Sequence, residues 1–538
     1  MVFARRSTTL LAAIIASCAM VLSLTACTSD NKTVVDGQTT VTSNSAGGVA
    51  VFTPSDGITL NQQVPLNKWA KLVPDLTKAL VDAGFKKGDI NHTTSDSLDK
   101  QSRAIQDFVV DHLSNNTTDD SGIAIAPDNM TLLVAPVVEA DASTRQYGDY
   151  VSQNLSTNDV TDEAATSDGE SSEDDSSNTE SDSTASDEQA QAVDRLVSSL
   201  KLAKESGMHV VLLGNSIEGY KPDAFVKFSD AQTIGKLQAE KMVSKLKLDK
   251  ASKDNPKYIE VLLPYTAVDE KGNANDSTFA QEAFRGIWQV LGSYYQKGVV
   301  ESPSGTLDGK STENDWQAVA YDAAKEGSTA KVLDKRLAKT DGQSTLTRID
   351  GIITMNDYIA SEVVKELDDL GYTGSAADIN PQITISGIVG NITGKKDLSR
   401  DAVPDPIKSP ENDNANDSSS SDDDADEDTS ASDKDRDSQW PLVTGYGAYV
   451  SNIPSIVNGK QWMTGMEDRQ TIATDIAQAC AKLNKDEALN SMPSIRNSEV
   501  GGVKKIPTIS EPLLAVSASN LKSALIDPGY ISLADAGL

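Results

Sequence analysis

The chain has 538 residues, of which 80 are Asp or Glu and 48 are Lys or Arg, giving a formal net charge of −32. This length suffices for two or three domains, because a single hydrophobic core stops growing at roughly 250 to 300 residues. Two acidic stretches, 159–188 and 411–437, supply −12 and −10 of the net charge and leave −10 for all other residues. An acidic chain without a basic face does not attract polyphosphate, so we expect no nucleic-acid partner.

The N-terminus has the pattern of an export signal. Two arginines precede an apolar run over 10–22, which is shorter than the roughly 20 residues that a membrane span needs. The run leads into a Leu-Thr-Ala-Cys sequence at 24–27, which resembles a bacterial lipobox. We therefore expect a signal peptide over 1–26, a lipid anchor on Cys27 and a flexible tether over 27–47. The mature protein would lie on the extracytoplasmic face of the cell membrane, anchored to it by lipid.

Beyond the tether, continuous apolar runs alternate with helical patterns, as in parallel sheets that helices cover on both faces. In chain order we predict a strand over 48–52, helices over 69–84 and 101–113, a strand over 131–135, a helix through 193–203 and a strand over 210–213. The series starts again with a helix over 233–246, a strand over 258–263, a helix over 279–291, a strand over 352–355, a helix over 359–370 and a strand over 383–386. Two such series predict an α/β fold with two similar lobes, each a parallel sheet flanked by helices.

The two lobes also suggest where a ligand would bind. Ligands of open α/β sheets bind beyond the carboxyl ends of the strands, so two lobes that face each other would form a cleft. Two acidic insertions, 158–191 and 407–438, interrupt the series. Because low hydrophobicity and high charge cannot repay the entropy of ordering, we expect both insertions to be disordered.

The residue pattern gives little support to catalysis. The three histidines, His92, His112 and His209, form no pair with metal-binding spacing. The sequence 214–219 follows a strand but is one residue too long for a nucleophile elbow. After cleavage and lipidation only Cys480 remains, so no disulfide and no cysteine cluster is expected. We therefore expect no enzyme activity, no cofactor and no metal.

Several short sequences resemble one family, and they occur in that family's order. They are 225–239, Lys68-Trp69, Met355-Asn356-Asp357, 443–448, 458–464 and the closing segment 506–520. Together they resemble the bacterial type I periplasmic sugar-binding proteins, particularly the xylose and multiple-sugar branch. The resemblance covers nearly all of 48–538 and implies two lobes joined by a three-strand hinge. It also implies a receptor that closes over one sugar and presents it to an ABC permease.

This family resemblance also divides the chain into lobes. The first lobe would comprise 48–228 plus about 462–490, and the second would comprise 229–461 plus about 506–538. We expect the receptor to be a monomer whose partners are the sugar, the permease and, through its lipid, the membrane.

Carried over position by position, the resemblance implies a set of sugar-binding residues. They are Trp69, Asn215, Asn275, Asp276, Trp316, Asn356, Asp357, Tyr446 and Gln461. Amide and carboxylate groups pair with sugar hydroxyls, and aromatic faces cover the C–H surfaces of a sugar. A structural interpretation stays open as well: Trp69 could be a core residue, and Asn356 with Asp357 could cap the following helix.

Three positions depart from the family's pattern. The family's Gln-Asp corresponds to Tyr446-Gly447, its Tyr-Asp-Arg to 213–215, and the lysine after its Gln-x-x-Thr to Glu467. Loss of charged contacts removes charge-assisted hydrogen bonds of roughly 1.5 to 3 kcal/mol each. Either the ligand is a different one, larger or bound more through stacking on Tyr446, or the cleft no longer binds a solute. In the second case the chain would be a non-transport lipoprotein that serves as a sensor or scaffold for a membrane partner.

Overall fold

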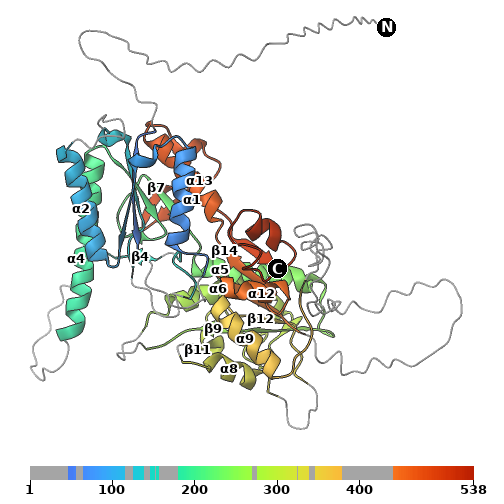
Figure 1. Ribbon diagram of the computed structural model, residues 1–538. Coiled ribbons are helices and arrows are strands. Elements are labelled where there is room, and N and C mark those ends of the chain that lie inside the picture. Colours follow the sequence, from blue (N-terminus) through green and yellow to red (C-terminus); the bar gives the residue numbers. More distant parts are fainter. Residues whose placement is uncertain are drawn as a thin grey trace, which may run out of the picture. The chain divides into compact units, whose positions relative to one another are not determined.

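The computed structural model describes ten parts of the chain. These are residues 46–55, 65–115, 125–138, 146–151, 153–156, 180–268, 275–323, 325–338, 346–377 and 440–538, without the side chains of 115 and 180–188. The predicted signal peptide and lipidated Cys27, the predicted strand over 383–386 and the acidic insertion 407–438 lie outside these residues. Residues Ser45–Leu538 form one compact unit, in which two large sheets are each flanked by helices (Figure 1).

The first sheet has seven strands. In pairing order they are β15 (Ile495–Val500), β16 (Val503–Ser510), β7 (Ala224–Lys227), β5 (His209–Leu213), β3 (Met130–Val134), β1 (Gly48–Pro54) and β2 (Ile90–Ser95). All neighbours pair in parallel except the hairpin of β15 and β16. The central strands are buried apolar runs, as the sequence predicts.

The second sheet has six strands. In pairing order they are β10 (Val300–Glu301), β8 (Lys257–Val261), β12 (Gly351–Ile353), β13 (Leu442–Tyr446), β14 (Met463–Met466) and β17 (Leu514–Ser517). Only β14 and β17 pair antiparallel. Two small parallel pairs accompany the large sheets: β9 (Leu263–Pro264) with β11 (Ala320–Tyr321), and β4 (Asn154–Leu155) with β6 (Ser216–Ile217).

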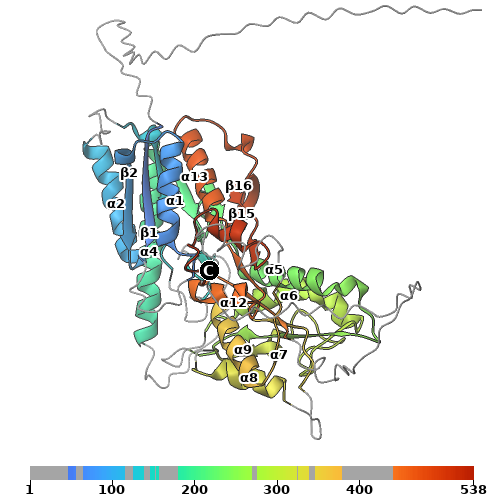
Figure 2. The same cartoon turned by 45° about the vertical axis from the view of Figure 1, so that its right-hand side comes forward.

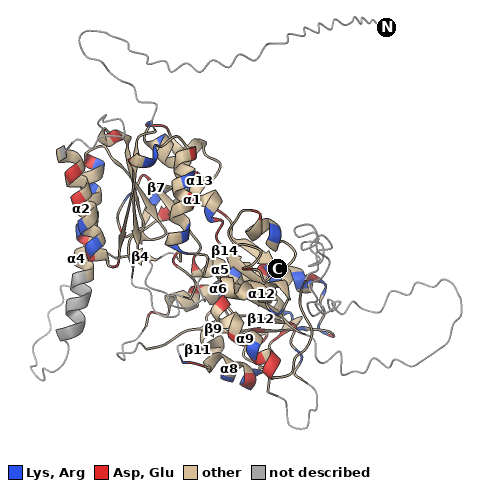
Figure 3. Ribbon diagram, in the orientation of Figure 1, with Lys and Arg blue, Asp and Glu red and all other residues tan. Residues whose placement is uncertain are grey.

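Helices cover both faces of the first sheet (Figures 1 and 2). On one face α1 (Trp69–Asp82) and α13 (Arg469–Leu483) pack against Val49, Val51 and their neighbours. On the other face α2 (Leu98–Asn115) and α4 (Glu180–Glu205) pack against Ala50, Phe52 and their neighbours. Alternate residues of one strand thus enter two separate cores, which follows from the two-residue period of a strand. Acidic and basic side chains are interspersed along α2 (Figure 3).

The second sheet is covered in the same manner. Helices α5 (Ala231–Leu246) and α6 (Thr278–Gln296) pack on one face, with Ile259 and Ile353. Helices α8 (Ser328–Arg336) and α9 (Asp357–Asp369) pack on the other, with Ile352 and Val443. The remaining short helices are α7 (Trp316–Val319), α12 (Ile453–Val457), η1 (Lys87–Asp89), η2 (Pro127–Asn129), η3 (Leu248–Lys250), η5 (Val450–Asn452), η6 (Leu489–Ser491) and the π-helical turn η7 (Lys522–Ile526).

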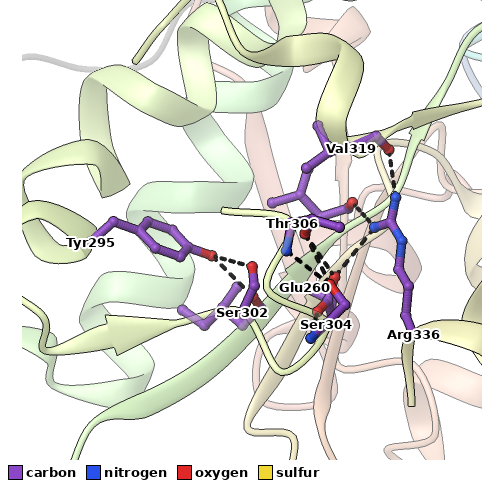
Figure 4. A network of polar contacts seen from close by, with 9 residues as sticks. Glu260, Tyr295, Ser302, Ser304, Thr306, Val319 and Arg336 are labelled. Atoms are coloured by element: carbon purple, nitrogen blue, oxygen red, sulfur yellow. Dashed lines mark hydrogen bonds and ion pairs between the residues drawn. The ribbon is translucent and has the colours of Figure 1, made fainter. Parts of the chain in front are cut away.

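A buried ion pair lies at the carboxyl end of β8 in the second sheet (Figure 4). Arg336 at the end of α8 lies 3.3 Å from the Glu260 carboxylate on β8, and the Glu260 side chain is fully buried. The same guanidinium donates to the carbonyl oxygens of Val261 and Val319. Glu260 also accepts from the Ser304 amide at 2.8 Å. One charged pair thus joins α8, the strand β8 and the loop after β10.

Within the described residues, the chain passes between the two sheets three times. The passages follow β7 at 228–230, β14 at 467–468 and β16 at 511–513. This arrangement confirms the predicted α/β fold with two parallel-sheet lobes and three crossings. Two predicted lobe limits differ from the strand pairings. The sequence places about 462–490 in the first lobe, but β14 pairs within the second sheet. It places about 506–538 in the second lobe, but β16 pairs within the first sheet.

The predicted acidic insertion is shorter than expected on its C-terminal side. Helix α4 begins at Glu180, so the expectation of disorder is wrong for 180–191. The acidic residues of 180–188 alternate with Ala, Ser and Thr and run directly into the apolar helical pattern of 193–203, so the helix extends backwards through them.

Candidate ligand site

Polar side chains gather where three neighbouring strands of the second sheet end. Strand β12 ends at Ile353, β13 at Tyr446 and β14 at Met466. Because these strands are parallel, their carboxyl ends lie along one edge of the sheet. After β12 the backbone turns at Met355, whose φ of 67° is left-handed, and Asn356 then begins α9.

Asn356 is buried and uses both atoms of its amide. Its Oδ1 accepts from the Ile359 amide at 2.9 Å and so caps α9. Its Nδ2 donates to Oε1 of Gln146 at 3.1 Å. Asn356 therefore caps α9, but the cap uses only one of the two polar atoms of its side chain. The other atom points to a residue that is 210 positions away in the sequence.

Asp357 lies behind Asn356 at the centre of a buried polar network. Its Oδ1 accepts from Nε2 of Gln461 at 2.7 Å, and its Oδ2 accepts from the Tyr449 amide and the Thr464 hydroxyl, both at 2.9 Å. Asn452 donates to Oε1 of Gln461 at 2.8 Å. Burial raises the pKa of Asp357 to about 6, although these hydrogen bonds favour its charged form. The network fixes the loop after β13 and keeps both carboxylate oxygens occupied within the protein.

Tyr446 belongs to a second buried network, which lies at two of the crossings. Its hydroxyl is 2.5 Å from the Ser229 hydroxyl and 3.4 Å from Glu467. The Glu467 carboxylate also accepts from the Ser229 amide at 2.6 Å and from the Ser229 hydroxyl. Burial raises the pKa of Glu467 to about 7 and raises the pKa of Tyr446. Glu467, at the position of the family's lysine, thus joins the crossing after β7 to the crossing after β14.

Residues 146–150, which we call the strap, contact the carboxyl-end region of the second sheet. Besides the bond from Asn356, the strap residue Gln146 accepts at its backbone oxygen from the Tyr449 hydroxyl at 2.6 Å. The side chain and the backbone of Gln146 are thus held by two different loops of the second lobe.

The middle of the strap is packed against aromatic rings and backbone. The Tyr147 ring lies 4.7 Å from the Phe279 ring and 6.3 Å from the Tyr446 ring, measured between centroids. Gly148 has a φ of 95°, and a Cβ at this position would lie 2.6 Å from the carbonyl oxygen of Asn67. Glycine is therefore required here for both its backbone conformation and its close approach.

The end of the strap is bound to the first lobe. The Asp149 carboxylate accepts from the Lys68 ammonium at 2.8 Å and from the Trp69 amide at 3.0 Å. The Tyr150 ring stacks on Phe228 at 4.8 Å and meets the Trp69 ring edge-on at 5.0 Å. Trp69 itself is 2 % exposed and also meets Phe228 edge-on. The core interpretation of Trp69 is thus correct for its packing, yet its neighbours include the strap.

Three of the predicted sugar contacts therefore have the strap as a common neighbour. Trp69 contacts Tyr150, Asn356 bonds to Gln146, and Tyr446 lies against Tyr147. These three residues come from different parts of both lobes.

Asn215 lies nearby and supports the chain that follows the strap. It follows β5, its Nδ2 donates to the Pro136 carbonyl and its Oδ1 accepts from the Gln153 amide, both at 2.9 Å. Asn215 is 3 % exposed and both ends of its amide are bound to backbone. These bonds hold two loops of the first lobe together.

The other predicted contacts lie around Tyr265. Asn275 donates to the Thr266 carbonyl at 2.8 Å, and the Trp316 ring meets Tyr265 edge-on at 5.1 Å. Asp276 is exposed and accepts from the Thr278 amide at 2.9 Å in the turn that begins α6. Phe279, which packs on Tyr147, is close to this group in sequence. Asn275 and Trp316 are thus grouped around 265–266 and not around Trp69, Asn356 and Tyr446.

The described residues offer no further chemistry of the kinds considered above. Among them, no group of three or more His, Cys, Asp or Glu side chains could hold a metal ion. The Cys480 thiol is buried, and burial raises its pKa. Within the same residues, no helix is long and apolar enough to cross a membrane.

The sequence motifs predict neither the strap itself nor its neighbours Tyr449 and Phe279. The strap has the sequence Gln-Tyr-Gly-Asp-Tyr, and the acidic stretch 159–188 follows it after a short uncharged segment, 151–158. Two tyrosines within four residues are a signal in a chain with only 5 % aromatic residues, because rings in a loop usually pack on something. The long-range partners of these rings leave no pattern in the sequence.

No protein-family model matches the chain, and no curated protein matches it. Solved structures do resemble it. One is an ABC transporter solute-binding protein from Clostridium phytofermentans with bound β-D-glucose, at 17 % identity and a TM-score of 0.45, covering 91 % of this chain and 99 % of that one. Another is a carbohydrate transporter solute-binding protein from Chloroflexus aurantiacus in complex with D-glucose, at 18 % identity and a TM-score of 0.43, covering 92 % and 98 %.

A third similar structure is a periplasmic ribose ABC transporter protein from Conexibacter woesei. It has 13 % identity and a TM-score of 0.42, and the match covers 90 % of this chain and 96 % of that one. Because these TM-scores are below 0.5, the fold assignment rests on the strand order and the three crossings described above. The first two of these similar structures are described as solute-binding proteins with bound glucose, and the third as a periplasmic ribose ABC transporter protein.

Proposed function

We propose that this chain is a lipid-anchored, extracytoplasmic solute-binding protein that captures a sugar and delivers it to an ABC permease. Two parallel-sheet lobes joined by three crossings can close over a ligand by hinge bending. The ligand would bind at the carboxyl ends of the strands, where open α/β sheets bind their ligands. The lipid on Cys27 would hold the protein at the membrane that contains the permease.

One observation carries this proposal: Trp69, Asn356 and Tyr446 all have the strap as a neighbour. An indole ring, an amide donor and a phenol ring next to one five-residue segment provide both apolar faces and a polar group. A sugar needs both, since it presents C–H surfaces together with hydroxyls.

The predicted sugar-binding residues take different roles in this proposal. Trp69, Asn356 and Tyr446 would contact the sugar directly. Asp357 and Gln461 would position the loop that carries Tyr449, and Asn215 would position the chain beyond the strap. Residues Asn275, Asp276 and Trp316 would lie at the margin of the site, next to Phe279.

Ligand-induced stabilisation tests the proposal. The mature protein is heated with D-glucose, D-ribose, arabinose, myo-inositol and D-allose, the ligands named for similar structures. A ligand at 100 times its dissociation constant should stabilise the folded state by about 2.7 kcal/mol. At least one member should therefore raise the melting temperature by several degrees. Absence of any response, extended to oligosaccharides, would contradict sugar binding.

The lipid anchor is tested separately. Cys27→Ser should move the protein from the membrane fraction to the soluble extracytoplasmic fraction, and it should abolish incorporation of a labelled fatty acid. Cys480→Ser is the matched control, since that thiol is buried in α13. Unchanged fractionation of the Cys27 variant would contradict the anchor.

The strap favours a second candidate function. The strap already binds Nδ2 of Asn356 through Gln146 and the Trp69 amide through Asp149. The chain could therefore be a lipoprotein of the same fold that serves as a sensor or scaffold for a membrane partner. Under this alternative no sugar stabilises the protein, and crosslinking in intact cells captures a membrane protein other than a permease.

A further inference from the structure

The strap is the strongest feature that the proposed function leaves unexplained. It contains no helix or strand, yet Tyr147 and Tyr150 are each 1 % exposed. It is tied to both lobes, through Gln146 and Tyr147 to the second and through Asp149 and Tyr150 to the first. Residues without regular structure are buried in this manner only where specific contacts hold them.

We propose that the strap is an intramolecular occupant of the sugar site and that a sugar must displace it in order to bind. This inference rests on the proposed function. The polar atoms of the strap take the places that sugar oxygens would take: the Gln146 amide oxygen accepts from Asn356, and its backbone oxygen accepts from Tyr449. The Tyr150 ring lies against the Trp69 ring, where the C–H face of a sugar would lie.

The fit of the strap is incomplete in one place. Nδ2 of Asn67 is buried and has no hydrogen-bond partner among the described residues, although Asn67 lies against Gly148. A buried donor without an acceptor is unfavourable, so the strap-filled state leaves one polar group unsatisfied. A ligand with several hydroxyls can supply an acceptor that the Gly148 backbone does not.

Displacement breaks hydrogen bonds at both ends of the strap. The Asp149 amide donates to the Asn67 carbonyl at 2.8 Å, the Tyr449 hydroxyl donates to the Gln146 carbonyl, and the Tyr150 hydroxyl donates to the Lys68 carbonyl. The ion pair of Asp149 with Lys68 lies at the boundary, with side chains 19 % and 18 % exposed. The strap lacks the hydrogen-bond ladder of a helix or strand, so it can open locally without unfolding either sheet.

The strap would therefore lower the apparent affinity for sugar. The apparent affinity equals the intrinsic affinity multiplied by the fraction of molecules in which the strap is displaced. Removing one of its anchors should raise that fraction and tighten binding. This effect has the opposite sign from the loss of a ligand contact, which weakens binding.

The first test compares two aspartates with matched surroundings. Asp149 accepts from Lys68 and from the Trp69 amide, and Asp223 accepts from Lys204 at 2.9 Å and from the Val210 amide at 2.8 Å. Asp149→Ala should bind the responding sugar of the panel about tenfold more tightly in calorimetry, because it loses charge-assisted hydrogen bonds. Asp223→Ala should bind as the wild type does. Equal affinity of all three proteins would overturn the strap proposal.

A second variant guards against a specific effect of the Lys68 charge. Gly148→Ala meets the carbonyl of Asn67 and strains a left-handed backbone, whereas Gly502→Ala, with a φ of 77°, meets nothing within 4 Å. Gly148→Ala should also tighten binding relative to Gly502→Ala. Unchanged or weakened binding by Gly148→Ala, in a protein that melts cooperatively, would overturn the proposal.

Hydrogen–deuterium exchange of the wild-type protein gives an independent readout. Saturating sugar should increase exchange in peptides that cover 146–151 and decrease it in peptides that cover 353–357. Decreased exchange in both would show that the strap stays in place as an ordinary part of the site. If no sugar binds to the wild type or to either strap variant, the proposed function itself fails.

Discussion

Asn356 illustrates how one side chain can have a structural and a functional role. Its Oδ1 caps α9 and its Nδ2 donates to the strap. The two roles belong to different atoms, so substitutions can separate them. Serine keeps an oxygen that can cap a helix and lacks the amide donor, whereas alanine lacks both groups.

In the Asp149→Ala background, where the strap is already released, Asn356→Ser should leave the melting temperature nearly unchanged and weaken sugar binding up to about tenfold, since it removes one hydrogen bond from the ligand. Asn356→Ala should also lose about 1 kcal/mol of folding free energy with the cap. Thermal melting and calorimetry on both variants measure these effects. The control is Ser97→Ala, which removes the cap contact to the Lys100 amide in α2 and should leave affinity unchanged. Equal affinity of Asp149→Ala with and without Asn356→Ser would reduce Asn356 to a cap.

Glu467 should make the stability of the protein depend on pH. Burial raises its pKa from 4.5 to about 7 in the folded protein, so the folded state favours the protonated carboxyl. Its stabilising contribution is therefore complete below pH 4.5 and is lost as pH rises through about 7. The loss amounts to about 3 kcal/mol.

Glu467→Gln should remove this dependence and keep an oxygen that accepts from Ser229. Urea unfolding at pH 4.5, 6 and 7.5 gives the unfolding free energy of the wild type and of the variant. Asp357, with its raised pKa of about 6, is present in both proteins, so its effect cancels in the difference. The wild type should lose stability relative to the variant as pH rises. A difference in unfolding free energy that stays constant with pH would contradict the raised pKa of Glu467. Glu499→Gln is the control, because the Glu499 side chain is exposed on β15, and it should behave like the wild type.

At the scale of elements, α5 and α6 are in contact through glycines. A Cβ on Gly235 would overlap the carbonyl oxygen of Ala283, and a Cβ on Gly286 would overlap the carbonyl oxygen of Gln232. The two helix backbones therefore approach so closely that the glycines cannot carry a side chain.

Gly286→Ala should destabilise the second lobe by about 1 to 3 kcal/mol or more, because the helices must separate to admit the methyl group. Urea unfolding measures the loss. Gly309→Ala is the comparison, since its nearest contact would be 3.3 Å from Tyr295. Equal stability of the two variants would show that the helices separate at little cost.

The ion pair of Glu260 and Arg336 is a second element-scale contact. Arg336→Met leaves a buried carboxylate without its partner and should cost about 3 to 5 kcal/mol, measured by urea unfolding. The double variant with Glu260→Gln should recover much of the loss. Arg103→Met, which breaks the exposed pair with Asp99, should have no measurable effect. A similar small effect of Arg336→Met would contradict the burial of the pair.

The elements that the sequence predicts best are those with uniform environments. Strand β5 is a continuous apolar run and α5 has a capping Asp230 with a regular apolar face, and both are predicted within a few residues. Edge strands are missed because their residues face solvent: β2 has the sequence Ile-Asn-His-Thr-Thr-Ser. Strand β16 carries Pro507 and two lysines, which are also typical of loops.

The site was predictable only in part, for a related physical reason. Short motifs pointed to Trp69, Asn356 and Tyr446, which surround the strap. The strap itself depends on contacts between residues that are 80 to 303 positions apart, such as Gln146 with Tyr449. A period of two or 3.6 residues contains no information on such contacts.

At the scale of the whole molecule, function depends on the three crossings between the lobes. It also depends on whether the strap or a sugar lies next to Trp69, Asn356 and Tyr446. Glu467 and Ser229 join two crossings through a buried hydrogen bond, and the strap joins the two lobes. A sugar that replaces the strap would exchange one set of contacts between the lobes for another. The affinity for sugar is then the difference between two occupied states.

A crystal structure of the mature protein with the most strongly stabilising sugar tests this account most directly. The account predicts the sugar against the Trp69 ring, with a hydroxyl accepting from Nδ2 of Asn356 and with residues 146–150 moved away from both. A sugar bound elsewhere, with Gln146 still bonded to Asn356 and Tyr150 still packed on Trp69, would contradict it.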